Sequence, residues 1–353
     1  MKVLTVLGAR PQFIKAAPVS RCLREHHEEF LVHTGQHYDD AMSDLFFREL
    51  EIPAPDVNLG VGSGPHGAQT AAMLEGIESI ALEQRPERML IYGDTNSTLA
   101  GALAGTKLHI PIAHVEAGLR SYDRGMPEEV NRVVADHLSD LLLCPTDAPV
   151  WNLAREGISN GVRVVGDVML DAFQQNLQRA RLLDLKPPVS FVLLTVHRAE
   201  NVDDREVLGR IMRGVAGSGC DVIFPAHPRT RRALDDAGIP VGRNVRVIEP
   251  VGYLEMLALE ESAEVIATDS GGVQKEAYFA GRPCITLRDT TEWTETVEAG
   301  WNVLAGTDPE AIAHAIRTFR PSGARPNVFG DGHAAERIVE CVTGNNMGSL
   351  WTR

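Results

Sequence analysis

Short apolar runs rich in β-branched residues alternate along the chain with stretches whose apolar residues recur at helical spacing. Short apolar runs bounded by turn residues predict buried strands, and a period of about 3.6 residues predicts helices. In the first half this pattern predicts strands at 3–7, 29–33, 88–92, 111–116, 141–144 and 162–165, with helices at 13–26, 67–84 and 97–107. Such alternation is typical of parallel sheets built from βαβ units.

The same alternation restarts in the second half, after a helical stretch at 171–183 and the segment 184–188. It predicts strands at 191–196, 221–225, 245–249, 264–268 and 283–287, with helices at 207–216, 229–237, 272–280 and 335–342. We therefore expect an α/β protein of two doubly wound domains, 1–166 and 189–343, with a hinge at 167–188 and a tail at 344–353. We expect the ligand in the cleft between the domains, because ligands of open α/β sheets bind at the carboxyl ends of the strands.

Composition and charge narrow the class of ligand. The chain has 353 residues, which is enough for two domains that each have a core. A net charge of -14 argues against a broad nucleic-acid or membrane surface, so an anion must be held by a few arginines and helix N-termini. The absence of a signal peptide or a long apolar run predicts a cytoplasmic protein. The five scattered cysteines predict free thiols rather than disulfides or a metal site.

Candidate chemistry in the first half lies at the ends of predicted strands. The turn after the first strand opens a helix whose N–H groups, with Arg10 and Lys15, suit an anion. Asp94 and Glu116 follow two later strands, and Glu128 begins a helix. Each carboxylate alone has a structural alternative, as a helix cap or as the partner of a neighbouring arginine. Three of them at neighbouring strand ends predict acid–base work.

The second half repeats the arrangement with a glycine turn. Gly271 and Gly272 allow a diphosphate to approach the backbone, and Ser270 can cap the helix or bind phosphate. Glu276 follows one helical turn later, where a carboxylate can accept both hydroxyls of a ribose. Asp269 has a simpler interpretation as a helix N-cap. The combination predicts a site for a nucleoside diphosphate.

A histidine and an arginine end the first strand of the second half, at His197 and Arg198. A cation pair at a strand end suits a departing phosphate. The usual alternative for a single histidine is a place in the core, and Arg198 beside it makes that less attractive. The absence of a Cys/His cluster argues against zinc.

Taken together, these motifs resemble the non-hydrolysing UDP-N-acetylglucosamine 2-epimerases. The resemblance rests on stretches 8–12, 114–120, 127–129 and 269–276 and covers nearly the whole chain. It implies two Rossmann-like domains of the glycosyltransferase-B type, a homodimer, and conversion of UDP-GlcNAc to UDP-ManNAc. The resemblance places the substrate contacts at Arg10, Lys15, Asp94, Glu116, His197, Arg198, Ser270, Gly271, Gly272, Glu276 and Arg288. Among the catalytic positions, Asp94, Glu116 and Glu128 are those assigned to acid–base work, and His197 is the fourth.

The expected chemistry uses no cofactor. The C2 proton of a closed sugar ring is barely acidic, so inversion needs either transient oxidation by NAD or elimination of UDP across C1–C2 to a glycal, followed by re-addition. The sequence lacks a GxGxxG fingerprint and a Tyr-x-x-x-Lys pair, which argues against NAD. Carboxylates near C2 and cations for the departing diphosphate favour elimination.

Departures from the family pattern leave the sugar and the regulation open. Where many relatives carry a substrate-contacting arginine this chain has Trp293, a form that resembles the subgroup acting on UDP-2,3-diacetamido-glucuronate, and Met256 replaces an aromatic residue near the uridine. At the positions that bind a second, activating UDP-GlcNAc in many relatives, Gln36 is retained, but Asp39 replaces a glutamine and Ala68 an arginine. We therefore expect an enzyme without that activation. The alternatives are a glycosyltransferase of the same fold, a nucleotide-sugar-binding regulator and a hydrolysing epimerase.

Overall fold

Two all-parallel sheets organise the chain, and the computed structural model describes residues 1–36 and 49–344. Within these residues the first sheet has seven strands in the order β3-β2-β1-β4-β5-β6-β7, and the second has six in the order β10-β9-β8-β11-β12-β13. Each sheet therefore reverses its winding direction beside its first strand, between β1 and β4 or between β8 and β11. Such a reversal is where ligands bind in open α/β sheets.

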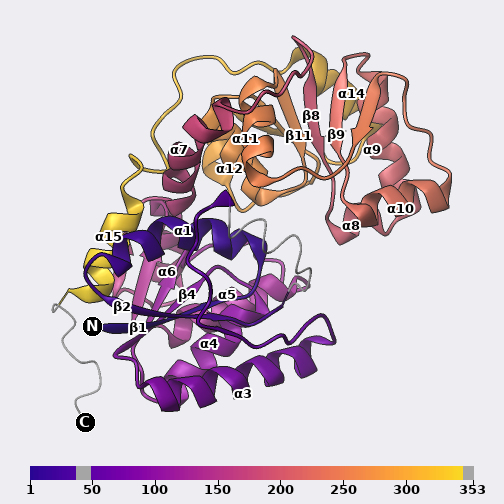
Figure 1. Ribbon diagram of the computed structural model, residues 1–353. Helices are drawn as coiled ribbons and strands as arrows, with labels where there is room; N and C mark the ends of the chain where they lie inside the picture. Colours follow the sequence, from indigo (N-terminus) through magenta and orange to yellow (C-terminus); the bar gives the residue numbers. More distant parts are fainter. Residues whose placement is uncertain (37–48, 345–353) are drawn as a thin grey trace. The chain divides into compact units, whose positions relative to one another are not determined.

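The first sheet is buried on both faces by helices (Figure 1). Its strands are β1 (Lys2–Leu7), β2 (Glu28–His33), β3 (Val57–Asn58), β4 (Arg88–Tyr92), β5 (Ile112–Val115), β6 (Leu141–Cys144) and β7 (Val162–Val164). The helices of this half are α1 (Arg10–Arg24), α3 (His66–Gln84), α4 (Asn96–Lys107), α5 (Pro127–Leu138), α6 (Asp147–Arg155) and α7 (Val168–Arg181). Every residue of β4, β5 and β6 is buried, as expected for central strands of a parallel sheet.

Close approach of α4 to the sheet explains the small residues of that helix. A Cβ atom at Gly101 would lie 2.8 Å from the side chain of Ile91 on β4, and one at Gly105 equally close to Ile112 on β5. Helix α4 also contacts α3 and α5, so these three helices form one layer. Their apolar residues pack with β1, β4 and β5 in a single core cluster.

The second sheet repeats this construction. Its strands are β8 (Val192–Thr195), β9 (Val222–Pro225), β10 (Val245–Ile248), β11 (Val265–Thr268), β12 (Cys284–Thr286) and β13 (Asn302–Leu304). Its helices are α8 (Ala199–Val202), α9 (Arg205–Gly217), α10 (Pro228–Ala237), α11 (Tyr253–Ser262), α12 (Gly271–Ala280), α13 (Thr294–Glu298) and α14 (Pro309–Thr318). Two separate core clusters, one with α9 and α14 and one with α11 and α12, cover the sheet.

The predicted strands are all present, with ends that differ by at most one residue. The predicted pair of doubly wound α/β domains is therefore confirmed. Strands β3 and β13 and helices α6, α8, α11, α13 and α14 were not predicted; the two strands have two and three residues, too few for a clear apolar run. Among the described residues, no helix is both long and apolar enough to cross a membrane.

The C-terminal helix α15 (Ala334–Thr343) belongs with the first sheet, which differs from the predicted domain 189–343. The chain divides into a first unit, 1–174 with the segment from Val328 onward, and a second unit, 175–327. Helix α15 packs against α1 (Figure 1), and the Ala335 N–H donates a 2.8 Å hydrogen bond to Asp171 on α7. Helix periodicity predicts that α15 exists but cannot show which sheet it covers. The predicted tail from 345 onward lies outside the described residues.

Candidate active site

The first candidate turn, between β1 and α1, is tied to the end of β4 by a side chain that the sequence did not single out. Gln12 accepts hydrogen bonds from the N–H groups of Gly8 and Ala9 at 2.7 and 3.0 Å and donates to the Tyr92 carbonyl at 2.7 Å. Those two N–H groups of the turn are therefore occupied, and the expectation that the N–H groups of α1 itself suit an anion stays a prediction. The backbone of Arg10 begins α1, and its side chain lies outside the described part of the structure.

Lys15 and Glu116 form a buried ion pair at the carboxyl ends of β1 and β5. Glu116 follows β5 directly, and its N–H donates to the Leu143 carbonyl at 3.0 Å. Its φ of 68° is unusual for a residue with a side chain, and such backbone is commonly kept for a functional reason. A Cβ atom at Gly93 would lie 3.5 Å from the Lys15 ammonium. Lys15 therefore joins Glu116 to the turn that carries Asp94.

Asp94 is paired with Arg132 on α5, and about one third of its side chain is exposed. Arg132 also donates to Glu129 at 2.8 Å, and Asn131 donates to the Asp94 carbonyl at 3.0 Å. Helix α5 thus fixes both the backbone and the side chain of Asp94. The structure thus pairs Lys15 with Glu116 and places the turn that precedes Asp94 beside Lys15.

Glu128, the third predicted carboxylate, is exposed in the first turn of α5, and within the described residues it makes no ion pair or hydrogen bond. Its neighbour Glu129 is buried instead and accepts from the N–H groups of Ser121 and Tyr122, each at 2.9 Å. Glu129 therefore anchors the loop before the helix. The two glutamates differ in burial, and the sequence alone does not show which of them is buried.

In the second unit, Asp269 organises the turn after β8. Its buried carboxylate accepts from the N–H groups of His197 and Arg198 at about 3.1 and 3.0 Å and from Asn201 at 3.1 Å. The half-exposed His197 ring lies 3.5 Å from the same carboxylate. The N-cap of α12 is Ser270, whose hydroxyl accepts from the Val273 N–H, so the interpretation of Asp269 as that cap is wrong.

Trp293 covers the N-terminus of α12. A Cβ atom at Gly271 would lie 3.2 Å from the Trp293 indole nitrogen, so the ring packs closely on this glycine. The Lys275 ammonium lies 3.9 Å from the ring centroid, and both side chains are buried. This geometry is a cation–π contact. Gly272 is the second residue of α12.

Glu276 lies on α12 beside two buried groups of α11, Glu260 and Tyr253. Burial and the neighbouring charge and hydrogen bond of Glu276 raise the pKa of Glu260 well above its usual range. Burial, followed by the charge of Glu276, likewise raises the pKa of the Tyr253 hydroxyl. One carboxyl of this pair therefore stays protonated and donates a hydrogen bond to the other.

Arg198 and Arg288 share a buried carboxylate, that of Glu292. The two terminal nitrogens of Arg288 each donate to the Glu292 carboxylate at 3.0 Å, and a terminal nitrogen of Arg198 lies 3.6 Å from the same carboxylate. Arg198 also donates to the Asp269 carbonyl at 3.0 Å. Burial alone would raise the pKa of Glu292, but the bonds from Arg288 and the charges of both arginines lower it to about 2. The pair of cations is held in place before any ligand binds.

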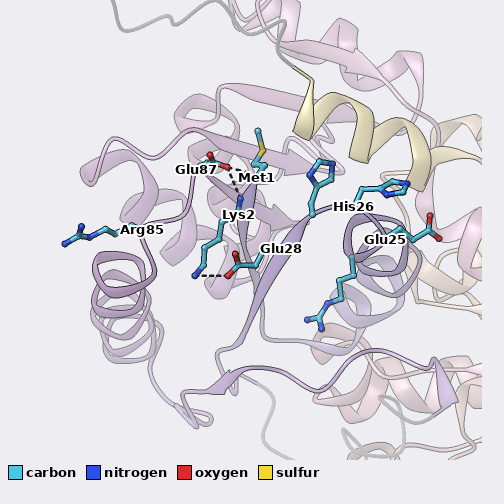
Figure 2. A pocket seen from close by; sticks show the side chains of 9 residues that line it. Met1, Lys2, Glu25, His26, Glu28, Arg85 and Glu87 are labelled. Carbon is cyan, nitrogen blue, oxygen red and sulfur yellow. Dashed lines mark hydrogen bonds and ion pairs between the residues drawn. The ribbon is translucent and has the colours of Figure 1, made fainter.

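A hollow of about 640 Å³ lies elsewhere, at the amino ends of the first sheet's strands (Figure 2). Its lining includes Lys2, which is ion-paired with Glu28 at 3.0 Å, and Glu87. None of the predicted site residues lines it. Among the described residues, no group of three His, Cys, Asp or Glu side chains could hold a metal ion.

Comparison with known proteins identifies the family. The model of the UDP-N-acetylglucosamine 2-epimerase family matches residues 21–343. The chain belongs to the UDP-N-acetylglucosamine 2-epimerase family. It is therefore an isomerase, as the sequence predicted, and its two units have the predicted glycosyltransferase-B type of fold.

Three relatives cover nearly the whole chain. A UDP-N-acetylglucosamine 2-epimerase homolog of Methanococcus maripaludis is 52% identical, over 97% of this chain and 99% of its own length. The UDP-2,3-diacetamido-2,3-dideoxy-D-glucuronate 2-epimerase of Pseudomonas aeruginosa is 48% identical over 96% and 99%. The crystal structure of the Methanocaldococcus jannaschii UDP-GlcNAc 2-epimerase with UDP-GlcNAc and UDP is 45% identical over 97% and 99%, with a TM-score of 0.90.

The positions expected to bind an activating second substrate are only partly described. Gln36 is engaged with the start of α4, where its side chain accepts from the Ser97 N–H at 3.0 Å and from the Ser97 hydroxyl at 2.7 Å. Ala68 is exposed on α3, and Asp39 lies outside the described residues. The absence of activation stays a prediction.

Proposed function

We propose that this epimerase inverts carbon 2 of a UDP-linked 2-acetamido sugar and that its substrate pair is UDP-N-acetylglucosamine and UDP-N-acetylmannosamine. The observation that carries the proposal is the group formed by Lys15, Glu116 and the turn of Asp94 at the carboxyl ends of β1, β4 and β5. An ion pair favours the ionised form of a carboxylate, which is the form that accepts a proton. The M. jannaschii relative, with UDP-GlcNAc and UDP bound, supports the choice of sugar.

In the proposed reaction one carboxylate takes the C2 proton while the bond from C1 to the UDP oxygen breaks. The electron pair of the C2–H bond becomes the second bond between C1 and C2, and UDP leaves with the electron pair of the C1–O bond. UDP then adds back to C1 of the resulting 2-acetamidoglucal, and a carboxylic acid on the opposite face delivers a proton to C2. Asp94, Glu116 and Glu128 are the candidates for these two proton roles.

The second unit supplies the groups that stabilise departing UDP. Arg198 and Arg288 carry positive charge for the diphosphate, and His197 can donate a hydrogen bond to it. The start of α12, at Ser270, Gly271 and Gly272, offers backbone N–H groups and the positive end of a helix. Glu276 accepts the ribose hydroxyls. Because Glu292 and Asp269 hold Arg198 and Arg288 in advance, little reorganisation accompanies the charge that develops on UDP.

A second substrate is favoured by one specific observation. The P. aeruginosa relative that acts on UDP-2,3-diacetamido-2,3-dideoxyglucuronate is 48% identical, against 45% for the M. jannaschii enzyme. The Trp293 and Lys275 contact is the part of the site that departs from the common pattern. The same elimination and re-addition would apply to that sugar, because its C2 carries the same acetamido group.

The test is to incubate the purified protein in D₂O with each UDP-sugar in turn and to follow C1 and C2 by NMR. We expect UDP-GlcNAc to equilibrate with its C2 epimer and the product to carry deuterium at C2. Turnover of the diacetamido-glucuronate alone would assign the second substrate. Full retention of C2 protium would exclude elimination, and release of free N-acetylmannosamine would identify a hydrolysing enzyme. Binding without turnover of either sugar would overturn the proposal.

A further inference from the structure

A buried network of charged side chains connects the turns that carry Asp94 and Glu116. At its centre, Asp136 on α5 lies 2.8 Å from the His114 Nδ1 and accepts from the Gly118 N–H at 3.1 Å and from Arg120 at 2.7 Å. Arg120 in turn forms two 2.7 Å bonds with Glu156 on α6. Both Asp136 and His114 are almost completely inaccessible to solvent.

The hydrogen bonds of His114 join Asp136 to the turn before Asp94. Its Nε2 lies 2.7 Å from the Gly93 carbonyl oxygen, which can only accept, so this nitrogen carries a hydrogen. Its Nδ1 faces Asp136, which Arg120 also contacts. Burial raises the pKa of Asp136, but the bonds and charges of His114 and Arg120 lower it further, to below its usual range. Asp136 is therefore held on two sides, by His114 and by Arg120.

Both ends of this network hold a glycine in the left-handed region beside a candidate acid–base residue. Gly93, which precedes Asp94, has a φ of 62°, and Gly118, two residues after Glu116, has a φ of 81°. His114 holds the first turn through the Gly93 carbonyl, and Asp136 holds the second through the Gly118 N–H. Packing leaves no room for a side chain at the second turn, because a Cβ atom at Gly118 would lie 2.7 Å from the Pro149 carbonyl oxygen.

We propose that Asp136, acting through His114, is a positioning residue that sets the spacing of Asp94 and Glu116 for proton transfer at C2. This inference rests on the proposed function. Neither residue reaches the sugar; each holds the backbone of a turn. Small displacements of catalytic groups can cost about 100-fold in rate. A loss of this spacing should slow protonation of the glycal more than binding of the nucleotide, because most of the predicted nucleotide contacts, from His197 to Arg288, lie in the second unit.

The experiment compares Asp136→Asn with Asp140→Asn in the full-length enzyme. Asp140 is a matched control, because it also holds the backbone of β5, through the Ile112 N–H at 2.9 Å, but at the start of the strand. For Asp136→Asn we expect kcat to fall about 10- to 100-fold, KM and the affinity for UDP to stay within twofold, and the ratio of released UDP to epimerised product to rise. We expect Asp140→Asn to match the wild type in all four.

The ratio of released UDP to epimer separates positioning from a loss of folded protein, because it does not depend on the concentration of active enzyme. If Asp136→Asn does not fold, His114→Gln carries the test, since it leaves the Asp136–Arg120 pair intact and strands no buried carboxylate. An unchanged ratio and kcat in whichever variant folds would overturn the positioning role. A wild type that does not exchange the C2 proton would instead overturn the proposed function.

Discussion

The two units build their sites at the same edge of the same kind of sheet but with opposite arrangements of charge. In the first unit the candidate catalytic groups are carboxylates, and each of the two paired ones is held by a cation, Glu116 by Lys15 and Asp94 by Arg132. In the second unit the candidate binding groups are cations, and Glu292 holds both arginines. One topology thus presents either proton acceptors or anion binders, and side chains alone decide which.

The largest effect should come from the carboxylates of the first unit. We expect Asp94→Asn, Glu116→Gln and Glu128→Gln each to lower kcat about 100- to 10,000-fold, because each removes a group proposed to transfer a proton. Circular dichroism and melting should show folded protein in each case. Glu75→Gln, an exposed change on α3, is the control and should keep normal activity. Near-normal kcat in all three variants would mean that these carboxylates do not transfer protons and have only structural roles, as caps or in ion pairs.

A smaller effect should come from the carboxylate that holds the cations of the second unit. We expect Glu292→Gln to lower kcat/KM about 10- to 100-fold, because Arg198 and Arg288 lose their shared charged partner. The control is Glu249→Gln, which removes an exposed glutamate paired with Arg231. Equal activity of the two variants would show that the arginines are placed without Glu292.

The same residue predicts a dependence on acid. Because its pKa falls from the usual 4.5 to about 2 on folding, Glu292 contributes stability that is complete above pH 4.5 and is lost as the pH falls toward 2. The contribution is about 3 kcal/mol at neutral pH. The free energy of unfolding of the wild type, measured in urea, should therefore fall as the pH is lowered from 4.5 toward 2. Glu292→Gln should lose less over the same range, because glutamine does not titrate.

The smallest effect should come from Glu260, whose pKa moves in the other direction. Its raised pKa makes its contribution complete below about pH 4.5 and progressively lost as the pH rises. Glutamine imitates the protonated acid and does not titrate, so we expect Glu260→Gln to gain melting temperature over the wild type as the pH rises from 5 to 9, by roughly 2–4 °C for each kcal/mol. Glu264→Gln, an exposed change, should show no such trend. A constant difference would mean that Glu260 is ionised in the folded protein.

The sequence predicts the strands well because central strands of parallel sheets are continuous apolar runs. It also predicts where Asp94, Glu116 and His197 lie, since carboxyl ends of parallel strands share one edge of a sheet. It does not predict what holds them. Asp136 lies 22 residues from His114, and Glu156 lies 36 from Arg120, so each contact depends on the packing of helices against the sheet. The contrast between exposed Glu128 and buried Glu129 is decided by packing as well.

The place of α15 has a consequence for synthesis. The second unit, 175–327, is one continuous stretch of chain, whereas the first unit needs a segment that begins only at Val328. The ribosome must therefore translate the whole second unit before the helix that packs against α1 exists. The hydrogen bond from the Ala335 N–H to Asp171 likewise cannot form before that helix is translated. The half of the enzyme that begins first is thus completed last, and a nascent chain stopped before α15 leaves the face of α1 uncovered.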